Sequence, residues 1–213
     1  MNVSKKTRTL TTAAILTALT FILGLTPIGY IPLPTMKITI LCIPVLIGVL
    51  LEGLSVGMWL GFVFGLTSLI QIFMGSPLGQ LMIGISLFRT TLVVFIPRLL
   101  VPMVAYYVHK LIRRIGKSIT DKAGYAVAAL LGSLTNTIFF LGMMYLLYLP
   151  ELDQIGAFFG TNATGVTAVL GSVVVTNGVP EAIAATIIVS AVCIALGRLY
   201  KDKRSIKAEE LEI

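Results

Sequence analysis

Arg98 is the residue of this sequence whose chemistry is hardest to reconcile with its surroundings. It lies near the middle of an apolar stretch, Leu81–Tyr107, that contains one other charged residue, Arg89. The stretch is long enough to span a membrane. A guanidinium stays protonated at physiological pH, so at that depth it requires a carboxylate, a phosphate, carbonyl groups or water. Because intramembrane charges usually serve a function, Arg98 indicates a site for an anionic ligand.

Other polar residues are expected at a similar depth. Asn136 lies near the middle of one apolar segment, among hydroxyl-bearing residues, and Asn177 and Glu181 lie near the middle of another. Asn177 and Glu181 are four residues apart, which places them on one face of a regular helix, although the proline between them predicts a kink. Gln71 offers a polar side chain nearer the end of its segment. These residues are candidates for contacting the ligand of Arg98.

Two interpretations of Arg98 remain open from the residues alone. In the first, Arg98 and Glu181 form a buried ion pair that joins two helices. In the second, Arg98 binds the anionic group of a substrate, Asn136 hydrogen-bonds its amide or hydroxyl groups, and Glu181 orients the site. The second is favoured, because hydroxyl groups around Asn136 are harder to explain as structure. Arg89 is about 900° around a helix from Arg98, on the opposite face, where it either snorkels or steers a ligand inward.

Motifs for other kinds of chemistry are missing. The sequence has no Gly-rich phosphate-binding loop that ends in Lys-Ser or Lys-Thr, so it cannot hydrolyse ATP by that route. Cys42 and Cys193 fall in apolar runs, and with His109 as the single histidine no His/Cys metal site can be assembled. No Ser/His/Asp arrangement is present either. We therefore expect no enzyme, no cofactor and no metal, and a transport function would need energy from a partner or an ion gradient.

Composition predicts an all-α integral membrane protein. Of 213 residues, 57% are hydrophobic and 12% are charged, and the mean hydropathy is +0.99. Soluble domains are about a quarter charged. We expect one membrane domain over residues 1–213, with an N-terminal segment 1–9, a six-helix bundle 10–199 and a charged tail 200–213. The six expected transmembrane helices are Leu10–Leu25, Ile38–Leu51, Ser55–Met74, Leu81–His109, Gly124–Leu147 and Gly165–Leu199.

The basic residues predict the orientation of these helices. Thirteen of the 16 lysines and arginines fall before the first segment, in the loop after the fourth, or after the last. Basic clusters mark the cytoplasmic side. An even number of crossings then places both termini in the cytoplasm, and the net charge of +7 is explained without nucleic acid. The first connection on the outer side holds three prolines and Tyr30, and is either an ordered loop that caps a site or a plain turn.

Small residues recur at helical spacing in two places. Gly53, Gly57, Gly61 and Gly65 follow one another every four residues, which predicts a face for close internal helix packing. Ala14 and Ala18 have the same spacing in the first segment. That second stripe packs either inside the chain or against a separate subunit, and the residues alone do not decide between them.

Five segments, in order along the chain, carry a family resemblance. They are Thr26-Pro-Ile-Gly-Tyr-Ile-Pro32, Gly61-Phe-Val-Phe-Gly-Leu-Thr-Ser68, Ile96-Pro-Arg98, Gly132-Ser-Leu-Thr-Asn-Thr137 and Asn177-Gly-Val-Pro-Glu-Ala182. Over roughly residues 10–195 the sequence resembles the substrate-binding S components of energy-coupling factor (ECF) vitamin transporters, and among them the pantothenate-type branch.

The resemblance implies a fold, partners and a location. It implies a six-helix bundle in the bacterial plasma membrane that captures a vitamin near the outer face, capped by the first and third outer-side loops. Such subunits dock on a membrane T subunit that is driven by two cytoplasmic ATPases, and they are thought to topple within the lipid. The segment from Ala14 to Ala18 looks like the AxxxA docking motif of the family, which favours a partner role for this stripe.

Pantothenate suits the candidate residues. It is a monocarboxylate with an amide and two hydroxyl groups, which matches one fixed cation with amide and hydroxyl groups nearby. Arg98 would hold the carboxylate and Asn136 the amide or hydroxyls. Another anionic vitamin remains open. So do a proton-coupled secondary carrier of a small anion that uses Arg98 and Glu181, and an assembly protein in which these two residues are purely structural.

Overall fold

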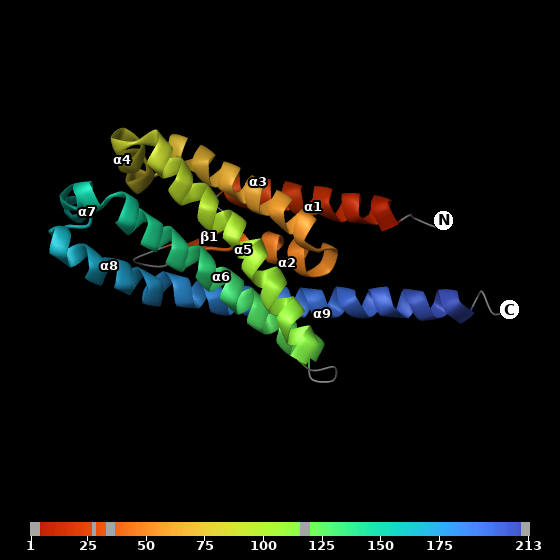
Figure 1. Ribbon diagram of the computed structural model, residues 1–213. Coiled ribbons are helices and arrows are strands. Elements are labelled where there is room, and N and C mark those ends of the chain that lie inside the picture. Colours follow the sequence, from red (N-terminus) through yellow and green to blue (C-terminus); the bar gives the residue numbers. More distant parts are fainter. Residues whose placement is uncertain (1–4, 27–28, 33–36, 116–119, 210–213) are drawn as a thin grey trace.

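The computed structural model describes residues 5–26, 29–32, 37–115 and 120–209. These residues form a bundle of helices with one short β-hairpin (Figure 1). The elements in chain order are α1 (Lys5–Leu25), β1 (Tyr30–Pro32), β2 (Lys37–Thr39), α2 (Cys42–Glu52), α3 (Leu54–Phe73), α4 (Pro77–Ile85), α5 (Leu87–Ile115), α6 (Thr120–Leu147), η2 (Leu149–Glu151), α7 (Leu152–Phe158), η3 (Ala163–Gly165), α8 (Val166–Val173), the π-helical turn η4 (Val174–Gly178) and α9 (Val179–Glu209).

Five helical segments in the described part of the chain are long and apolar enough to cross a membrane. They are Lys6–Leu25, Leu54–Phe73, Leu87–Arg114, Lys122–Leu147 and Ala163–Gly197. The remaining expected span, Ile38–Leu51, corresponds to α2, which has 11 residues. At 1.5 Å per residue α2 is about 16 Å long, roughly half the ~30 Å hydrocarbon core. The helical membrane fold is therefore present, and the count of six crossings stays a prediction.

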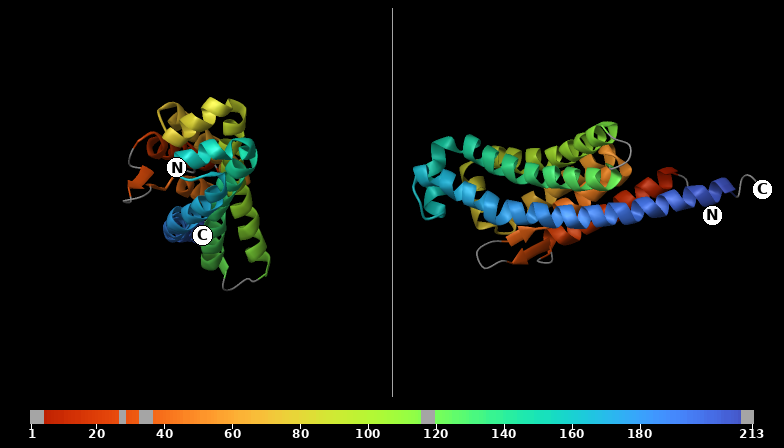
Figure 2. Two further views of the ribbon diagram at one scale, coloured as in Figure 1. Left: turned by 90° about the vertical axis from the view of Figure 1, so that its left-hand side faces the viewer. Right: turned by 90° about the horizontal axis from the view of Figure 1, so that it is seen from below.

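The bundle has two distinct ends. The start of α1, the end of α5, the start of α6 and the end of α9 lie towards one end, and α4 and α7 lie at the other (Figures 1 and 2). We call these the terminal end and the α7 end. Lys6, Arg8, Lys110 and Lys122 belong to the segments at the terminal end. The basic residues thus gather where the charge pattern predicted a common side.

The first connection contains the hairpin. β1 and β2 are antiparallel, with Tyr30 opposite Thr39 and Pro32 opposite Lys37. The β2 strand contacts η4 and α9. Residues 27–28 and 33–36 of the predicted loop lie outside the described residues, as does the side chain of Tyr30. The backbone that is described shows regular pairing rather than a plain turn.

Three glycines of the predicted stripe, Gly57, Gly61 and Gly65, pack inside the bundle as expected; Gly53 precedes α3 and a Cβ atom there would meet nothing within 4 Å, so its part of the prediction is wrong. A Cβ atom built on Gly61 would lie 2.7 Å from the carbonyl oxygen of Arg98, and one on Gly65 would lie 2.7 Å from the ring of Phe95. A Cβ atom on Gly57 would meet Val49 of α2 at 2.5 Å. Side chains cannot fit at these distances, so glycine permits near-backbone contact between α3 and α5.

Two of the expected spans are interrupted. The fourth, Leu81–His109, is divided at Ser86, whose extended backbone (φ −161°) ends α4 before α5 begins. The sixth is widened at η4, where the Val179 N–H bonds to the Val174 carbonyl. Pro180 explains the second case, because it has no N–H to continue the α-helical pattern. The third outer connection, expected as a loop, contains α7 and two short 3₁₀ turns, η2 and η3.

Apolar side chains form two buried cores and also cover the outside. One core lies among α1, α2, α3, α5, α6 and α9, and the other lies near the α7 end among α4 to α8. Many large apolar side chains are exposed on the helices, as expected for a lipid-facing surface. Trp59 of α3 is one of them, 52% exposed, and its Nε1 donates a hydrogen bond to Thr17 of α1 at 3.1 Å.

Candidate functional site

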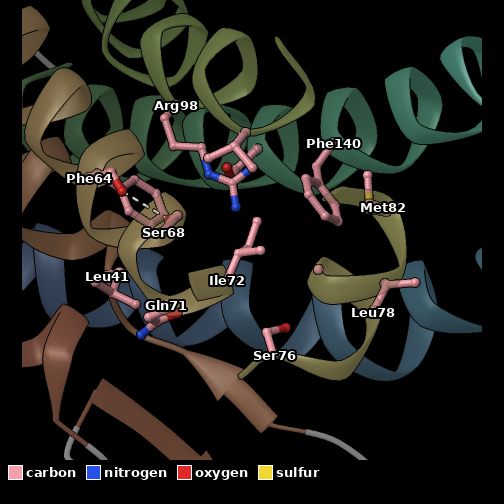
Figure 3. Close-up of a pocket in the computed structure, with 13 residues that line it drawn as sticks. Leu41, Phe64, Ser68, Gln71, Ile72, Ser76, Leu78, Met82, Arg98 and Phe140 are labelled. Carbon is pink, nitrogen blue, oxygen red and sulfur yellow. Dashed lines mark hydrogen bonds between the residues drawn. The ribbon is translucent and has the colours of Figure 1, made fainter. Parts of the chain in front are cut away.

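A cavity of about 150 Å³ lies among α3, α4, α5 and α6 (Figure 3). Five polar residues line it: two on α3, one on α5, one on α6 and one just before α4. These are Ser68, Gln71, Arg98, Asn136 and Ser76. The apolar lining is Leu41, Phe64, Ile72, Leu78, Met82, Val94 and Phe140, with Gly79.

Helical spacing explains why these residues share one cavity. In α5, Val94 and Arg98 are four residues apart, and so are Asn136 and Phe140 in α6. Residues at this spacing lie on one face of a helix. The cavity-facing side chains of α3 begin at Phe64 and recur after four, seven and eight residues, which is the same pattern. Three regular helix faces therefore converge on the space that Arg98 enters.

The guanidinium of Arg98 lies between two aromatic rings. Its central carbon is 4.8 Å from the centroid of Phe140 and 5.3 Å from that of Phe64. Each such contact is worth ~0.5–2 kcal/mol, and more when water is excluded. The Nε and Nη1 atoms of Arg98 are buried. Aromatic packing restrains the guanidinium, and a restrained fork of N–H donors suits a carboxylate.

Asn136 supplies a second polar group to the same cavity. It is 7% exposed, and its Oδ1 atom is buried without a hydrogen-bond partner among the residues that the structure describes. A buried carbonyl oxygen without a hydrogen-bond partner destabilises the protein by ~1–3 kcal/mol. A ligand that donates a hydrogen bond to this oxygen would remove that cost and bind more tightly. Gln71 also lines the cavity, and its Nε2 donates to the Gly24 carbonyl at the end of α1.

Asn177 and Glu181 lie away from this lining, on η4 and α9. Glu181 is 4% exposed, and its carboxylate accepts a contact of 3.6 Å from the Cys42 thiol. The Cys42 sulphur also lies 3.7 Å from the Ser133 hydroxyl. A direct role for either Asn177 or Glu181 in ligand binding stays a prediction.

Arg89 is placed in an ion pair near the α7 end. Its Nη1 lies 2.9 Å from a carboxylate oxygen of Glu151 and 3.3 Å from the Leu147 carbonyl. Nearby, Tyr148 follows the span of α6 and is fully buried. Burial raises the pKa of Tyr148, against the opposing effect of its hydrogen bond with Thr90, so its hydroxyl keeps its proton. Arg89 does not line the cavity, and steering of a ligand by this residue stays a prediction.

The alanine stripe of α1 faces outward. Ala14 and Ala18 are both exposed, and so are Ile15 and Leu19 beside them. Internal packing therefore does not account for the small residues on this face. Contact with lipid or with a partner subunit does, and the docking role stays a prediction.

Sequence reasoning missed the aromatic and apolar part of the site. Phe64 and Phe140 are ordinary apolar residues in their segments, yet each stands four residues from a polar lining residue. That spacing was a usable signal. Met82 had none, because the break at Ser86 that separates α4 from α5 is not marked by a proline or a glycine.

Comparison with known proteins identifies the family of this chain. Residues 8–193 match the family model of the ECF transporter, substrate-specific component. The chain is 32% identical over 180 residues to the pantothenic acid transporter PanT of Lactococcus lactis subsp. cremoris (strain MG1363), an alignment that covers 78% of this chain and 80% of that protein. The family match runs from α1 to about the middle of α9 and includes every residue of the cavity. The chain therefore belongs to the substrate-specific components of ECF transporters.

Proposed function

We propose that this protein is the high-affinity pantothenate-binding subunit of an ATP-driven ECF importer. The observation that carries the proposal is the cavity in which the guanidinium of Arg98 is held between two rings, close to the unsatisfied oxygen of Asn136. The similarity to a pantothenic acid transporter supports the choice of ligand. Such a cavity offers one fixed positive charge and few other polar groups, which suits a small monocarboxylate.

Each lining residue has a distinct role in this proposal. Arg98 binds the carboxylate through charge-assisted hydrogen bonds. Asn136 accepts a hydrogen bond from the amide or a hydroxyl group of the ligand, and Gln71 closes the site towards α1. Met82 and Phe140 contact the apolar part of the molecule. Glu181 and Asn177 support the helices behind the site.

The membrane arrangement and partners form the second part of the proposal. Both termini lie in the cytoplasm of a bacterial plasma membrane, with α2 and the hairpin together completing the second of six crossings. The basic residues at the terminal end support this orientation. The exposed face of Ala14 and Ala18 docks on a transmembrane T subunit, and two ATPase subunits provide the energy.

Calorimetric titration of the purified chain in detergent tests the ligand. We expect near-stoichiometric binding of pantothenate and weak or no binding of other vitamins. A clear response to a different vitamin, with none to pantothenate, would overturn the substrate and keep the family. If no vitamin of the panel gives a heat of binding, although the protein melts cooperatively and is therefore folded, the binding function would be contradicted.

A second assay distinguishes the importer subunit from a proton-coupled carrier. The chain is reconstituted alone in liposomes with an inward proton gradient, and pantothenate uptake is measured for the wild type and for Glu181→Gln. We expect no concentrative uptake by either protein, because the chain depends on partner ATPases. Gradient-driven uptake that Glu181→Gln uncouples would replace the proposal with a secondary carrier.

A further inference from the structure

The helix α4 is a wall of the cavity that is set apart from its neighbours. It contributes Leu78 and Met82 to the lining. Gly75 before it has a left-handed backbone (φ 112°), and Ser86 after it is extended. Nine residues are too few for a helix to be stable by itself, so the position of α4 depends on its tertiary contacts.

Tyr148 provides such a contact from the end of α6. Its ring is fully buried, and its hydroxyl lies 2.7 Å from Thr90 Oγ1. The same hydroxyl donates to the carbonyl of Met82 at 3.1 Å or of Ser86 at 3.3 Å. Thr90 and Tyr148 each have one hydroxyl proton, so two arrangements are possible. If Thr90 donates to the Ser86 carbonyl at 2.8 Å, Tyr148 donates to Thr90; if Thr90 donates to the phenol oxygen, the proton of Tyr148 goes to the backbone of α4. In either arrangement the phenol is hydrogen-bonded at the end of α4, to Met82 directly or to Ser86 through Thr90. Met82 is also the residue whose side chain lines the cavity.

The packing around Tyr148 places this hydrogen bond where water does not compete. Met82, Met144, Leu152 and Ile155 are all buried in the same apolar cluster. A hydrogen bond among buried groups is more stabilising than one in water. The contact therefore links the backbone of α4 to the junction between α6 and α7.

We propose that Tyr148 is a positioning residue that holds α4 against the cavity and thereby sets how tightly and how long the ligand is bound. This inference rests on the proposed function for its effect on pantothenate. Tyr148 acts through Met82 rather than by touching the ligand. If α4 is mobile in the free protein, binding must order it, and this cost weakens the affinity for the ligand. A mobile α4 also lets the bound ligand dissociate faster.

The substitution Tyr148→Phe removes the hydroxyl and keeps the ring. The Met82 carbonyl retains the Ser86 N–H at 3.0 Å, and the Ser86 carbonyl retains the Thr90 side chain at 2.8 Å. No buried backbone acceptor is left without a donor, so the fold survives. Thr90→Val removes the other hydroxyl of the same contact with little change in volume. Tyr145→Phe is the matched control, because Tyr145 lies in the last turn of α6, three residues before Tyr148, and its hydroxyl has no hydrogen bond within the described part of the chain.

Hydrogen–deuterium exchange of the ligand-free protein measures the position of α4 without any ligand. We expect amide exchange over residues 78–86 to become about five- to tenfold faster in Tyr148→Phe, the size of one lost hydrogen bond. Exchange elsewhere and in Tyr145→Phe should match the wild type. Unchanged exchange in α4 would overturn the inference. Faster exchange in all helices with a lower melting temperature would do the same, since it indicates a general structural role.

Pantothenate binding measures the consequence. We expect the dissociation constant to rise about five- to tenfold in Tyr148→Phe, chiefly through faster dissociation, with no further loss when Thr90→Val is added. Wild-type affinity in a variant whose α4 exchanges faster would refute the link to the site. If the wild type fails to bind pantothenate, the proposed substrate is wrong, and the exchange experiment still decides whether Tyr148 holds α4.

Discussion

Replacing Arg98 by glutamine should remove most of the affinity for pantothenate without unfolding the protein. The guanidinium lies between Phe140 and Phe64 at 4.8 and 5.3 Å and projects into the cavity (Figure 3). A hydrogen bond to a charged group is worth ~1.5–3 kcal/mol, and a bidentate contact makes two. After allowance for the cost of desolvating both charges, we expect a loss of ~3 kcal/mol, or about a hundredfold in the dissociation constant.

The variant Arg98→Lys tests the positive charge separately from the planar shape of the guanidinium. Lysine keeps a positive charge but loses the planar fork and most of the contact with the two rings, which is worth ~1 kcal/mol or more. We therefore expect binding about tenfold weaker than wild type, intermediate between arginine and glutamine. Arg114→Gln, an exposed arginine at the end of the same helix, is the control and should bind as the wild type does.

The assay is calorimetric titration with pantothenate and with pantothenol, in which a hydroxymethyl group replaces the carboxylate. The wild type should prefer pantothenate strongly, and Arg98→Gln should bind the two ligands about equally. Equal loss of both ligands together with a lower melting temperature would show that Arg98 supports the fold rather than the carboxylate. Undiminished pantothenate binding by Arg98→Gln would refute the assignment of the site.

Two further predictions concern helix contacts. Gly61→Ala should lower the free energy of unfolding by ~1–3 kcal/mol, because its Cβ atom would lie 2.7 Å from the carbonyl oxygen of Arg98. Thermal melting in detergent measures this effect, and Gly142→Ala is the control because position 142 has open space around it. Ala14→Leu or Ala18→Leu should abolish uptake by the reconstituted importer and leave pantothenate affinity unchanged, whereas Ala195→Leu, exposed on α9, should retain uptake. Loss of ligand binding in both α1 variants would contradict a separate docking face.

The sequence predicted the features that follow from regular periodicity. The apolar segments indicated a helical membrane protein, and the four-residue glycine repeat indicated close packing of another helix, which the structure identifies as α5. Arg98, Asn136 and Gln71 were all chosen from their depth in these segments, and the structure brings them to one cavity. Depth along a helix is readable from sequence because the membrane fixes the scale.

What the sequence did not reveal depends on contacts between distant segments. The pairing of Arg89 with Glu151 joins α5 to η2, and the clustering of Tyr148 with Met82 joins the end of α6 to α4. The break at Ser86 carries no proline or glycine, so hydropathy reads α4 and α5 as one long span. The short α2 was likewise assigned a full crossing, because a strand precedes it and adds apolar residues to the count.

The position of Trp59 makes the protein a spectroscopic reporter of its own surface. It is the single tryptophan of the chain, half-exposed on α3 and hydrogen-bonded to Thr17 of α1, the helix that bears the alanine stripe. The cavity lining contains no tryptophan. Intrinsic fluorescence should consequently respond to burial of the α1–α3 face against another subunit and remain nearly silent when the ligand enters, so docking and ligand capture can be followed as separate signals in one unlabelled sample.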